Sequence, residues 1–190
     1  LKNAEDMIAN CRMKRLMFNI TGTCTGGRCA GFNAFNAMWA ATYDIDKKFK
    51  THYHQRIKNW LENAQENDIT VSGALTDPKG DRSKSPSKQT DPDMNLHVVE
   101  IKDDGIVVRG AKVMICGVTA ANEIFIMPGT GYREEDKAYA VSFAIPRDSE
   151  NLTIIETRRP SDTRELETGF DIPVNHGGIT QAYLLFDDVF

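Results

Sequence analysis

Apolar residues in the first part of the chain recur at the spacing of amphipathic helices. Three segments repeat them in steps of three and four, which places them on one face of a helix. We expect these helices over Met7–Met17, Phe32–Ile45 and Tyr53–Ala64. Asn67 and Asp68 follow the third segment and predict its end.

From Ile69 onward the apolar period changes to two, which is typical of half-buried strands. Met94, Leu96 and Val98 alternate with polar neighbours, and the run from Tyr139 to Ile145 does the same. Further apolar runs predict strands at Ile106–Val108, Lys112–Val118, Ile124–Ile126, Leu152–Glu156 and Tyr183–Phe186.

The turn sequence Asp103-Asp104-Gly105 predicts a hairpin between two of these strands. Several short strands at such spacing indicate an antiparallel barrel or sandwich. We therefore predict an α+β chain with a helical region over residues 1–68 and a β domain over residues 69–190.

Composition narrows the class of protein. Apolar residues make up 41% of the 190 residues, enough for a buried core, and the net charge of −4 gives no basic excess for a nucleic-acid partner. No apolar run is long enough to cross a membrane, and no secretion signal opens the chain. Four scattered cysteines favour a reducing, cytoplasmic setting. Because the sequence begins at Leu1 and stops at Phe190 in an apolar run, we expect a piece of a longer protein.

Two cysteines, Cys24 and Cys29, lie in the glycine-rich segment Thr21–Gly31 just before a predicted helix. Small residues let a backbone approach a bulky ligand, and a helix N-terminus stabilises thiolates. Two thiolates are half of the ligand set of an iron–sulfur cluster, so the other ligands would lie outside this chain. The alternative is a glycine-rich helix entry with two buried free cysteines.

A long polar stretch, Gly73–Asp93, interrupts the strand pattern. Loops of this length in compact domains are usually functional or disordered. Lys79 and Arg82 can make charge-assisted hydrogen bonds to phosphate, and Gly80 suits close approach of a polar ligand. Spacing alone favours the alternative, a solvated turn with a corner at Asp77-Pro78.

Other chemistry-bearing residues favour structural roles. His52 and His54 lie two apart at the start of a helix, on different faces, so we expect no shared metal. Cys116 sits in a strand-like run and by default is a small buried residue.

Four segments together resemble one known family: Cys29–Met38, Gln65–Arg82, Asp104–Lys112 and Phe186–Phe190. They resemble the 4-hydroxyphenylacetate 3-hydroxylase-like flavoproteins, and within them the branch that dehydrates and isomerises 4-hydroxybutyryl-CoA. The resemblance implies an acyl-CoA dehydrogenase-like fold with N-terminal helices, an antiparallel β-barrel middle domain, and a C-terminal helical bundle that this chain lacks.

The resemblance also implies cofactors and their residues. Cys24 and Cys29 match two ligands of a [4Fe–4S] cluster, Cys24 with a one-residue shift, and Cys116 matches a residue near the flavin ring. FAD would be lined by Leu75, Thr76, Asp77, Pro78, Lys79, Gly80, Asp81 and Arg82. Family members assemble as tetramers, so a homotetramer with an acyl-CoA substrate is implied, with neither nucleic acid nor membrane as partner.

Two positions depart from the pattern of the branch. Cys116 stands where a Thr is usual, and a thiol is a weaker hydrogen-bond donor than a hydroxyl. Gln181 stands where the branch carries a catalytic Glu, and an amide cannot accept a proton as a general base. We therefore expect Gln181 to act as a polar contact to the thioester.

The expected function is dehydration and isomerisation of a four-carbon acyl-CoA with FAD and a [4Fe–4S] cluster. One alternative is a monooxygenase that uses reduced FAD on phenols of the 4-hydroxyphenylacetate type, which needs no cluster. The pair Cys24 and Cys29 argues against it, whereas Gln181 and Cys116 keep it open. The other alternative is a non-catalytic homologue that retains the fold.

Overall fold

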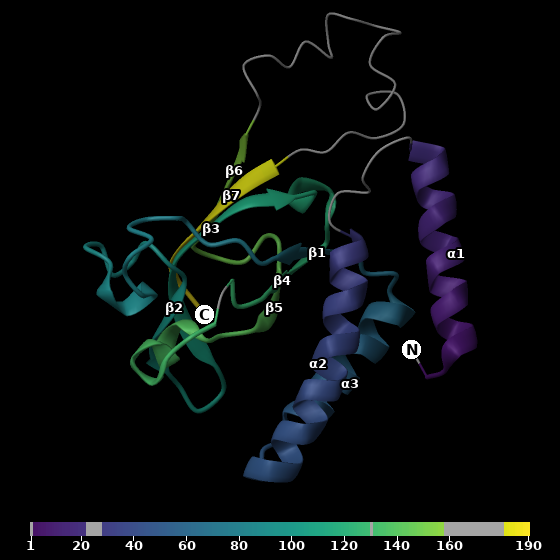
Figure 1. Ribbon diagram of the computed structural model, residues 1–190, viewed down its shortest axis with the longest axis horizontal. Coiled ribbons are helices and arrows are strands. Elements are labelled where there is room, and N and C mark those ends of the chain that lie inside the picture. Colours follow the sequence, from purple (N-terminus) through teal and green to yellow (C-terminus); the bar gives the residue numbers. More distant parts are fainter. Residues whose placement is uncertain (1, 22–27, 130, 158–180) are drawn as a thin grey trace, which may run out of the picture. The chain divides into compact units, whose positions relative to one another are not determined.

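The chain is described by a computed structural model that covers residues 2–21, 28–129, 131–157 and 181–190. These residues fall into two compact units (Figure 1). One unit contains the helices up to residue 70, and the other contains all the strands from residue 71 onward. Each unit is described by itself below.

The helical unit confirms the three helices that periodicity predicts. They are α1 over Ala4–Thr21, α2 over Arg28–Phe49 and α3 over Tyr53–Glu66, with Asn67 as the C-cap of α3. On the facing sides of α2 and α3, the rings of Phe35 and Trp60 stack with centroids 4.3 Å apart. This stacking and the burial of Ala34, Ile57 and Ala64 form a small apolar contact between the two helices.

Asp46 joins the end of α2 to the start of α3. Its carboxylate accepts hydrogen bonds from the Thr51 hydroxyl (2.6 Å), the Tyr53 backbone N–H (2.9 Å) and the His54 backbone N–H (2.8 Å). The first N–H groups of a helix have no partner within the helix, so a carboxylate at this position caps it. These hydrogen bonds lower the pKa of Asp46 although partial burial opposes them.

Within its described residues, the β unit has seven strands in two sheets. One sheet has the order β1-β4-β5 and the other the order β2-β3-β7-β6. The strands span Val71–Ala74 (β1), His97–Ile101 (β2), Ile106–Cys116 (β3), Glu123–Ile126 (β4), Phe143–Pro146 (β5), Leu152–Thr157 (β6) and Gln181–Val189 (β7). Three short 3-10 helices span Pro86–Lys88 (η1), Val118–Ala120 (η2) and Glu134–Tyr139 (η3).

The expected antiparallel barrel is not what the described strands form. They make two open sheets, and β1 pairs in parallel with β4, with Ala74 opposite Ile126, and not with its neighbour in sequence. A parallel pair needs a long crossover, and the polar loop and the β2–β3 hairpin occupy that crossover here. The hairpin itself is confirmed, since the Lys102 N–H donates to the Gly105 carbonyl at 2.9 Å.

Two other strand predictions need correction. The run from Tyr139 to Ile145 is a strand only from Phe143, because Tyr139 closes η3 and its hydroxyl donates to the Pro92 carbonyl. The two runs expected at Ile106–Val108 and Lys112–Val118 form one continuous strand, β3, which ends at Cys116.

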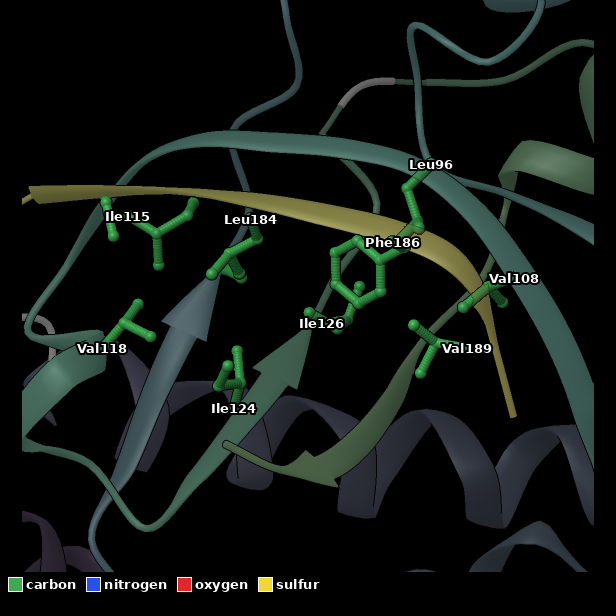
Figure 2. Close-up of a cluster of buried hydrophobic side chains, with 11 residues drawn as sticks. Leu96, Val108, Ile115, Val118, Ile124, Ile126, Leu184, Phe186 and Val189 are labelled. Atoms are coloured by element: carbon green, nitrogen blue, oxygen red, sulfur yellow. The ribbon is translucent and has the colours of Figure 1, made fainter. Parts of the chain in front are cut away.

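A single apolar core lies between the two sheets (Figure 2). Ile124 and Ile126 of β4 face Leu184 and Phe186 of β7 in this cluster, each at most 3% exposed. Burial of apolar surface of this kind is the main favourable contribution to folding. The core therefore fixes the two sheets against each other and with them the loops at their edges.

Two irregular residues shift the register between β3 and β7. Lys112 pairs with Leu184 and Ile115 with Ala182, so β3 has one additional residue here, and Met114 has a left-handed φ of 57°. The residue Asp188 is similarly additional on β7, with a φ of 56°. Bulges of this kind change which side chains face the core. As a result Lys112 and Ile115 are both buried although they are three residues apart.

Candidate functional site

The polar loop after β1 lines a hollow in the β unit. Its volume is about 450 Å³, in the range of small-molecule sites. Of the eight residues expected to line FAD, all except Gly80 contribute to its wall. The rest of the wall comes from Ser83–Pro86, Gln89, Asn95, and the segment after β4, with Gly129, Gly131, Arg133 and Asp136.

Lys112 of β3 binds this loop through hydrogen bonds of its ammonium group. Its ammonium donates to the Leu75 carbonyl (3.1 Å), the Met127 carbonyl (2.8 Å) and the Asp77 carboxylate (2.5 Å). Lys112 is only 2% exposed, and burial lowers its pKa while the hydrogen bond and charge of Asp77 oppose that shift. Three donors meet three acceptors, which satisfies the buried ammonium.

Gly129, in the loop after β4, packs directly against Asp77 and Leu75 in the wall of the hollow. A Cβ at this position would lie 2.2 Å from the Asp77 carboxylate oxygen and 2.7 Å from the Leu75 carbonyl oxygen. Only a glycine allows the backbone after β4 to approach the loop after β1 this closely.

The turn at the outer end of the loop is held by Gln89. Its side-chain amide donates to the Asp81 carbonyl at 2.9 Å and accepts from the Asp81 N–H at 3.0 Å. Gly80 has a left-handed φ of 45°, and a Cβ there would lie 2.5 Å from both the Gln89 Oε1 and the Met94 Sδ atoms. The turn thus needs glycine at this position.

A buried carboxylate, Asp136, ties the loop to η3. It accepts from the Ser87 hydroxyl (2.6 Å), the Ser87 N–H (3.1 Å) and the Arg133 N–H (3.3 Å). These bonds, that of the Ser87 hydroxyl foremost, lower the pKa of Asp136 to about 2, against the effect of burial. Asp136 is therefore an anion at neutral pH.

The cationic residues around the hollow are Lys79, Arg82, Lys84 and Arg133. All four are exposed. Such groups suit a ligand that carries phosphate, because hydrogen bonds to an ionised acceptor are stronger than neutral ones.

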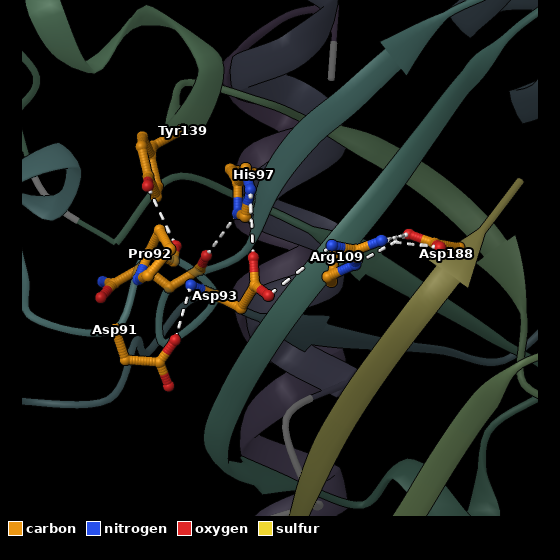
Figure 3. A network of polar contacts seen from close by, with 8 residues as sticks. Asp91, Pro92, Asp93, His97, Arg109, Tyr139 and Asp188 are labelled. Atoms are coloured by element: carbon orange, nitrogen blue, oxygen red, sulfur yellow. Dashed lines mark hydrogen bonds and ion pairs between the residues drawn. The ribbon is translucent and has the colours of Figure 1, made fainter.

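A second polar cluster holds the far end of the loop to the four-stranded sheet (Figure 3). Arg109 of β3 makes two hydrogen bonds to Asp188 of β7, at 2.8 and 2.7 Å, and lies 3.7 Å from Asp93. The Arg109 guanidinium lowers the pKa of Asp188. His97 of β2 stacks on Tyr139 with ring centroids 4.9 Å apart, and its Nδ1 lies 3.0 Å from the carbonyl oxygen of Asn95.

Cys116 and Gln181 lie side by side at the paired ends of β3 and β7. The Gln181 Nε2 lies 3.9 Å from the Cys116 Sγ, within the range of a weak N–H···S hydrogen bond, and the Ser72 hydroxyl donates to the Cys116 carbonyl at 2.8 Å. Because side chains alternate along a strand, Gln181 shares the outer face of β7 with Tyr183 and Leu185. Cys116 is partly buried, and neither it nor Gln181 lines the hollow.

The expected iron ligands cannot be placed in full. Cys24 lies outside the described residues, and of Cys29 only the backbone is described, in the first turn of α2. Among the described residues no three His, Cys, Asp or Glu side chains are grouped so that they could hold a metal ion. The His54 Nδ1 lies 3.2 Å from the Thr42 hydroxyl.

The fold and the loop define the class of protein. The chain belongs to the family described as 4-hydroxyphenylacetate 3-hydroxylase N terminal, whose sequence model matches residues 1–190. This confirms the family that the four sequence segments indicated.

Individual relatives are more specific. The chain is 45% identical, over its whole length and 39% of the relative's, to the 4-hydroxybutyryl-CoA dehydratase/vinylacetyl-CoA-Delta-isomerase of Clostridium aminobutyricum. A solved oxygen-tolerant archaeal 4-hydroxybutyryl-CoA dehydratase from N. maritimus matches all of the chain and 38% of its own, with 37% identity and a TM-score of 0.91. The oxygenase component of 4-hydroxyphenylacetate 3-monooxygenase, solved with FAD and 4-hydroxyphenylacetate, has a TM-score of 0.78 and 25% identity over the whole chain and 38% of its own. The chain thus spans less than half the length of these relatives.

The residues of the hollow fit a flavin dinucleotide. The wall has exposed cations that can bind phosphate, among them Lys79 and Arg82, and at Gly129 the lack of a side chain lets two loops pack closely. Thiolates suit iron, so the chemistry of Cys24 and Cys29 fits a cluster, although their geometry is outside what the structure describes.

Sequence analysis missed the residues that hold the site together. Lys112, Asp136 and Gly129 each act through contacts to the loop and not through a motif. The only available signal was a lysine within an otherwise apolar, strand-like run, Lys112–Val118.

Among the described helices, none is both long and apolar enough to cross a membrane.

Proposed function

We propose that the complete protein dehydrates and isomerises a four-carbon acyl-CoA of the 4-hydroxybutyryl-CoA type with FAD and a [4Fe–4S] cluster. The 45% identity over the whole chain to the C. aminobutyricum enzyme carries this proposal. The structural match to the N. maritimus dehydratase supports it independently.

Within this proposal, residues 1–68 end the helical domain and residues 69–190 form the flavin-binding domain. Leu75 to Arg82 would line FAD, Cys116 would lie near the flavin ring although it is outside the hollow, and Cys24 and Cys29 would supply two thiolates to the cluster. Bound in this way, the flavin would supply electron transfer and the cluster a site for the leaving hydroxyl. The complete protein would be a cytoplasmic homotetramer.

The role of Gln181 differs from that of an acid–base residue. Its amide can hydrogen-bond the thioester carbonyl, and its Nε2 lies 3.9 Å from the Cys116 Sγ. It cannot accept the α-proton. The base that takes this proton would therefore be another residue of the complete protein.

One observation favours a second function. A phenol monooxygenase that uses reduced FAD needs neither the cluster nor a carboxylate at position 181, and Gln181 is compatible with it. The structural match to the oxygenase component of 4-hydroxyphenylacetate 3-monooxygenase supports this alternative.

Iron, sulfide and flavin content of the complete protein, purified without oxygen, tests the proposal. We expect about four irons and one FAD per chain, together with turnover of 4-hydroxybutyryl-CoA. Flavin without iron, with turnover of phenols in the presence of reduced flavin and oxygen, would establish the monooxygenase instead. Bound flavin with no turnover of either substrate would indicate a non-catalytic homologue.

The ligand assignment has its own test. Replacing Cys29 with Ser should remove iron and leave FAD bound, because the flavin-binding residues belong to the β unit. Cys11, an exposed thiol on α1, provides the matched control. Cys11→Ser should retain both cofactors, and unchanged iron in Cys29→Ser would refute the assignment.

A further inference from the structure

Lys112 is a buried charge for which the proposed chemistry has no use. It is 2% exposed, and its three ammonium hydrogens meet two backbone carbonyls and one carboxylate. A buried ammonium is costly to desolvate and is retained where its partners need it. The identity of these partners indicates what it does.

The two carbonyls belong to the residues that directly follow the parallel strands β1 and β4. Leu75 follows Ala74, the last residue of β1, and Met127 follows Ile126, the last residue of β4, and these two ends are paired in register. Beyond the last pair the strands diverge into loops, so these carbonyls need another donor. Lys112 supplies it from β3, a strand of the other sheet.

Both loops that leave this edge line the hollow. Leu75, Thr76 and Asp77 come from the loop after β1 and Gly129 from the loop after β4, and Gly129 packs directly against Leu75 and Asp77. Asp77 connects Lys112 to this contact, because it accepts from Lys112 at 2.5 Å and fills the space that a side chain at Gly129 would occupy. The Val113 N–H, next to Lys112, also donates to the Thr76 carbonyl at 2.9 Å.

We infer that Lys112 is a positioning residue for the flavin, which holds the two loops together at the edge of the hollow by binding both strand ends and Asp77. It acts through the loop and does not line the hollow itself. This inference rests on the proposed function, since the ligand it positions is FAD.

The test compares FAD binding by complete proteins. In Lys112→Met, which keeps the length of the side chain and removes the ammonium, we expect FAD affinity to fall at least tenfold and the absorbance spectrum of bound flavin to shift. Val108→Ala, a core change on the same strand at a residue that is 2% exposed, is the stability control and should change FAD affinity less than twofold. Adding Asp77→Asn to Lys112→Met should restore part of the affinity, because the carboxylate left without its cation is removed.

Hydrogen exchange without flavin separates this inference from the proposed function. Backbone amides of residues 75–82, 127–129 and 131–133 should exchange faster in Lys112→Met than in the Val108→Ala control. If the wild-type protein binds FAD and Lys112→Met binds it no more weakly than the control does, the inference is overturned and the proposed function stands. A wild-type protein that binds no FAD would overturn the proposed function, and unchanged exchange in these loops would then overturn the positioning role as well.

Discussion

At the scale of single residues, Gly129 is the most sterically restricted position of the hollow. The nearest atoms to an added Cβ are the Asp77 carboxylate and the Leu75 backbone carbonyl, and the latter cannot rotate away. We expect Gly129→Ala to destabilise the protein by about 1–3 kcal/mol, as overpacking does elsewhere, and to weaken flavin binding. Chemical denaturation and flavin titration measure both effects.

The neighbouring Gly131 serves as the control for that substitution. A Cβ at Gly131 would meet nothing within 4 Å. Gly131→Ala should therefore leave the stability of the protein unchanged. Equal effects of the two substitutions would show that the contact between Gly129 and Asp77 is not what restricts this wall.

Asp136 gives the stability of the β unit a defined pH dependence. Its pKa is about 2, below the ordinary value of 3.8, so between these values the unfolded chain binds more protons than the folded one. Its contribution is complete above pH 3.8 and is lost as the pH falls towards 2. In urea denaturation at a series of pH values, Asp136→Asn should flatten the decline of stability below pH 4, and Asp104→Asn, in the exposed turn, should not.

At the scale of elements, the junction between α2 and α3 depends on Asp46. We expect Asp46→Ala to lower the thermal midpoint by about 2–4 °C, because two backbone N–H groups of α3 and the Thr51 hydroxyl lose their acceptor. Asp44→Ala, at an exposed position on the same helix, is the control for lost charge. Equal midpoints for the two variants would contradict the capping role.

The elements themselves could largely be predicted from sequence, and the pairing between them could not. Local signals sufficed for the three helices and for the hairpin at Asp103-Asp104-Gly105. The parallel pairing of β1 with β4 is non-local, since Ala74 and Ile126 are brought together only by the core. The same holds for the site: the loop from Leu75 to Arg82 follows from residue types, whereas the inward direction of Lys112 depends on strand register.

At the scale of the whole molecule, α1 carries many exposed apolar side chains. Met13, Leu16 and Ile20 lie on one face of this helix and are 40%, 60% and 62% exposed. Exposed apolar surface of this extent promotes association. We expect the 190-residue chain, produced by itself, to self-associate and to bind a hydrophobic dye.

Substitution of this face tests that expectation. The double variant Leu16→Glu with Ile20→Glu should reduce both dye binding and the mass measured by light scattering. Lys14→Glu, on another side of the same helix, should reduce neither. A wild-type chain that is monomeric and binds no dye would contradict the prediction.

The additional residue at Met114 has a consequence for insertions and deletions in β3. Along an uninterrupted strand, residues four apart share a face, so Lys112 and Cys116 would point the same way. The bulge shifts the alternation of side chains between the two faces by one residue after Met114, so Cys116 lies on the outer face beside Gln181. Removing this one residue would leave a regular strand in which Ile115 follows Lys112 by two positions and Cys116 follows it by three, so Ile115 would still face the core and Cys116 the outer face. A relative that lacks one residue at this position would therefore keep the same side chains on each face of the strand, with the bulge as the only difference.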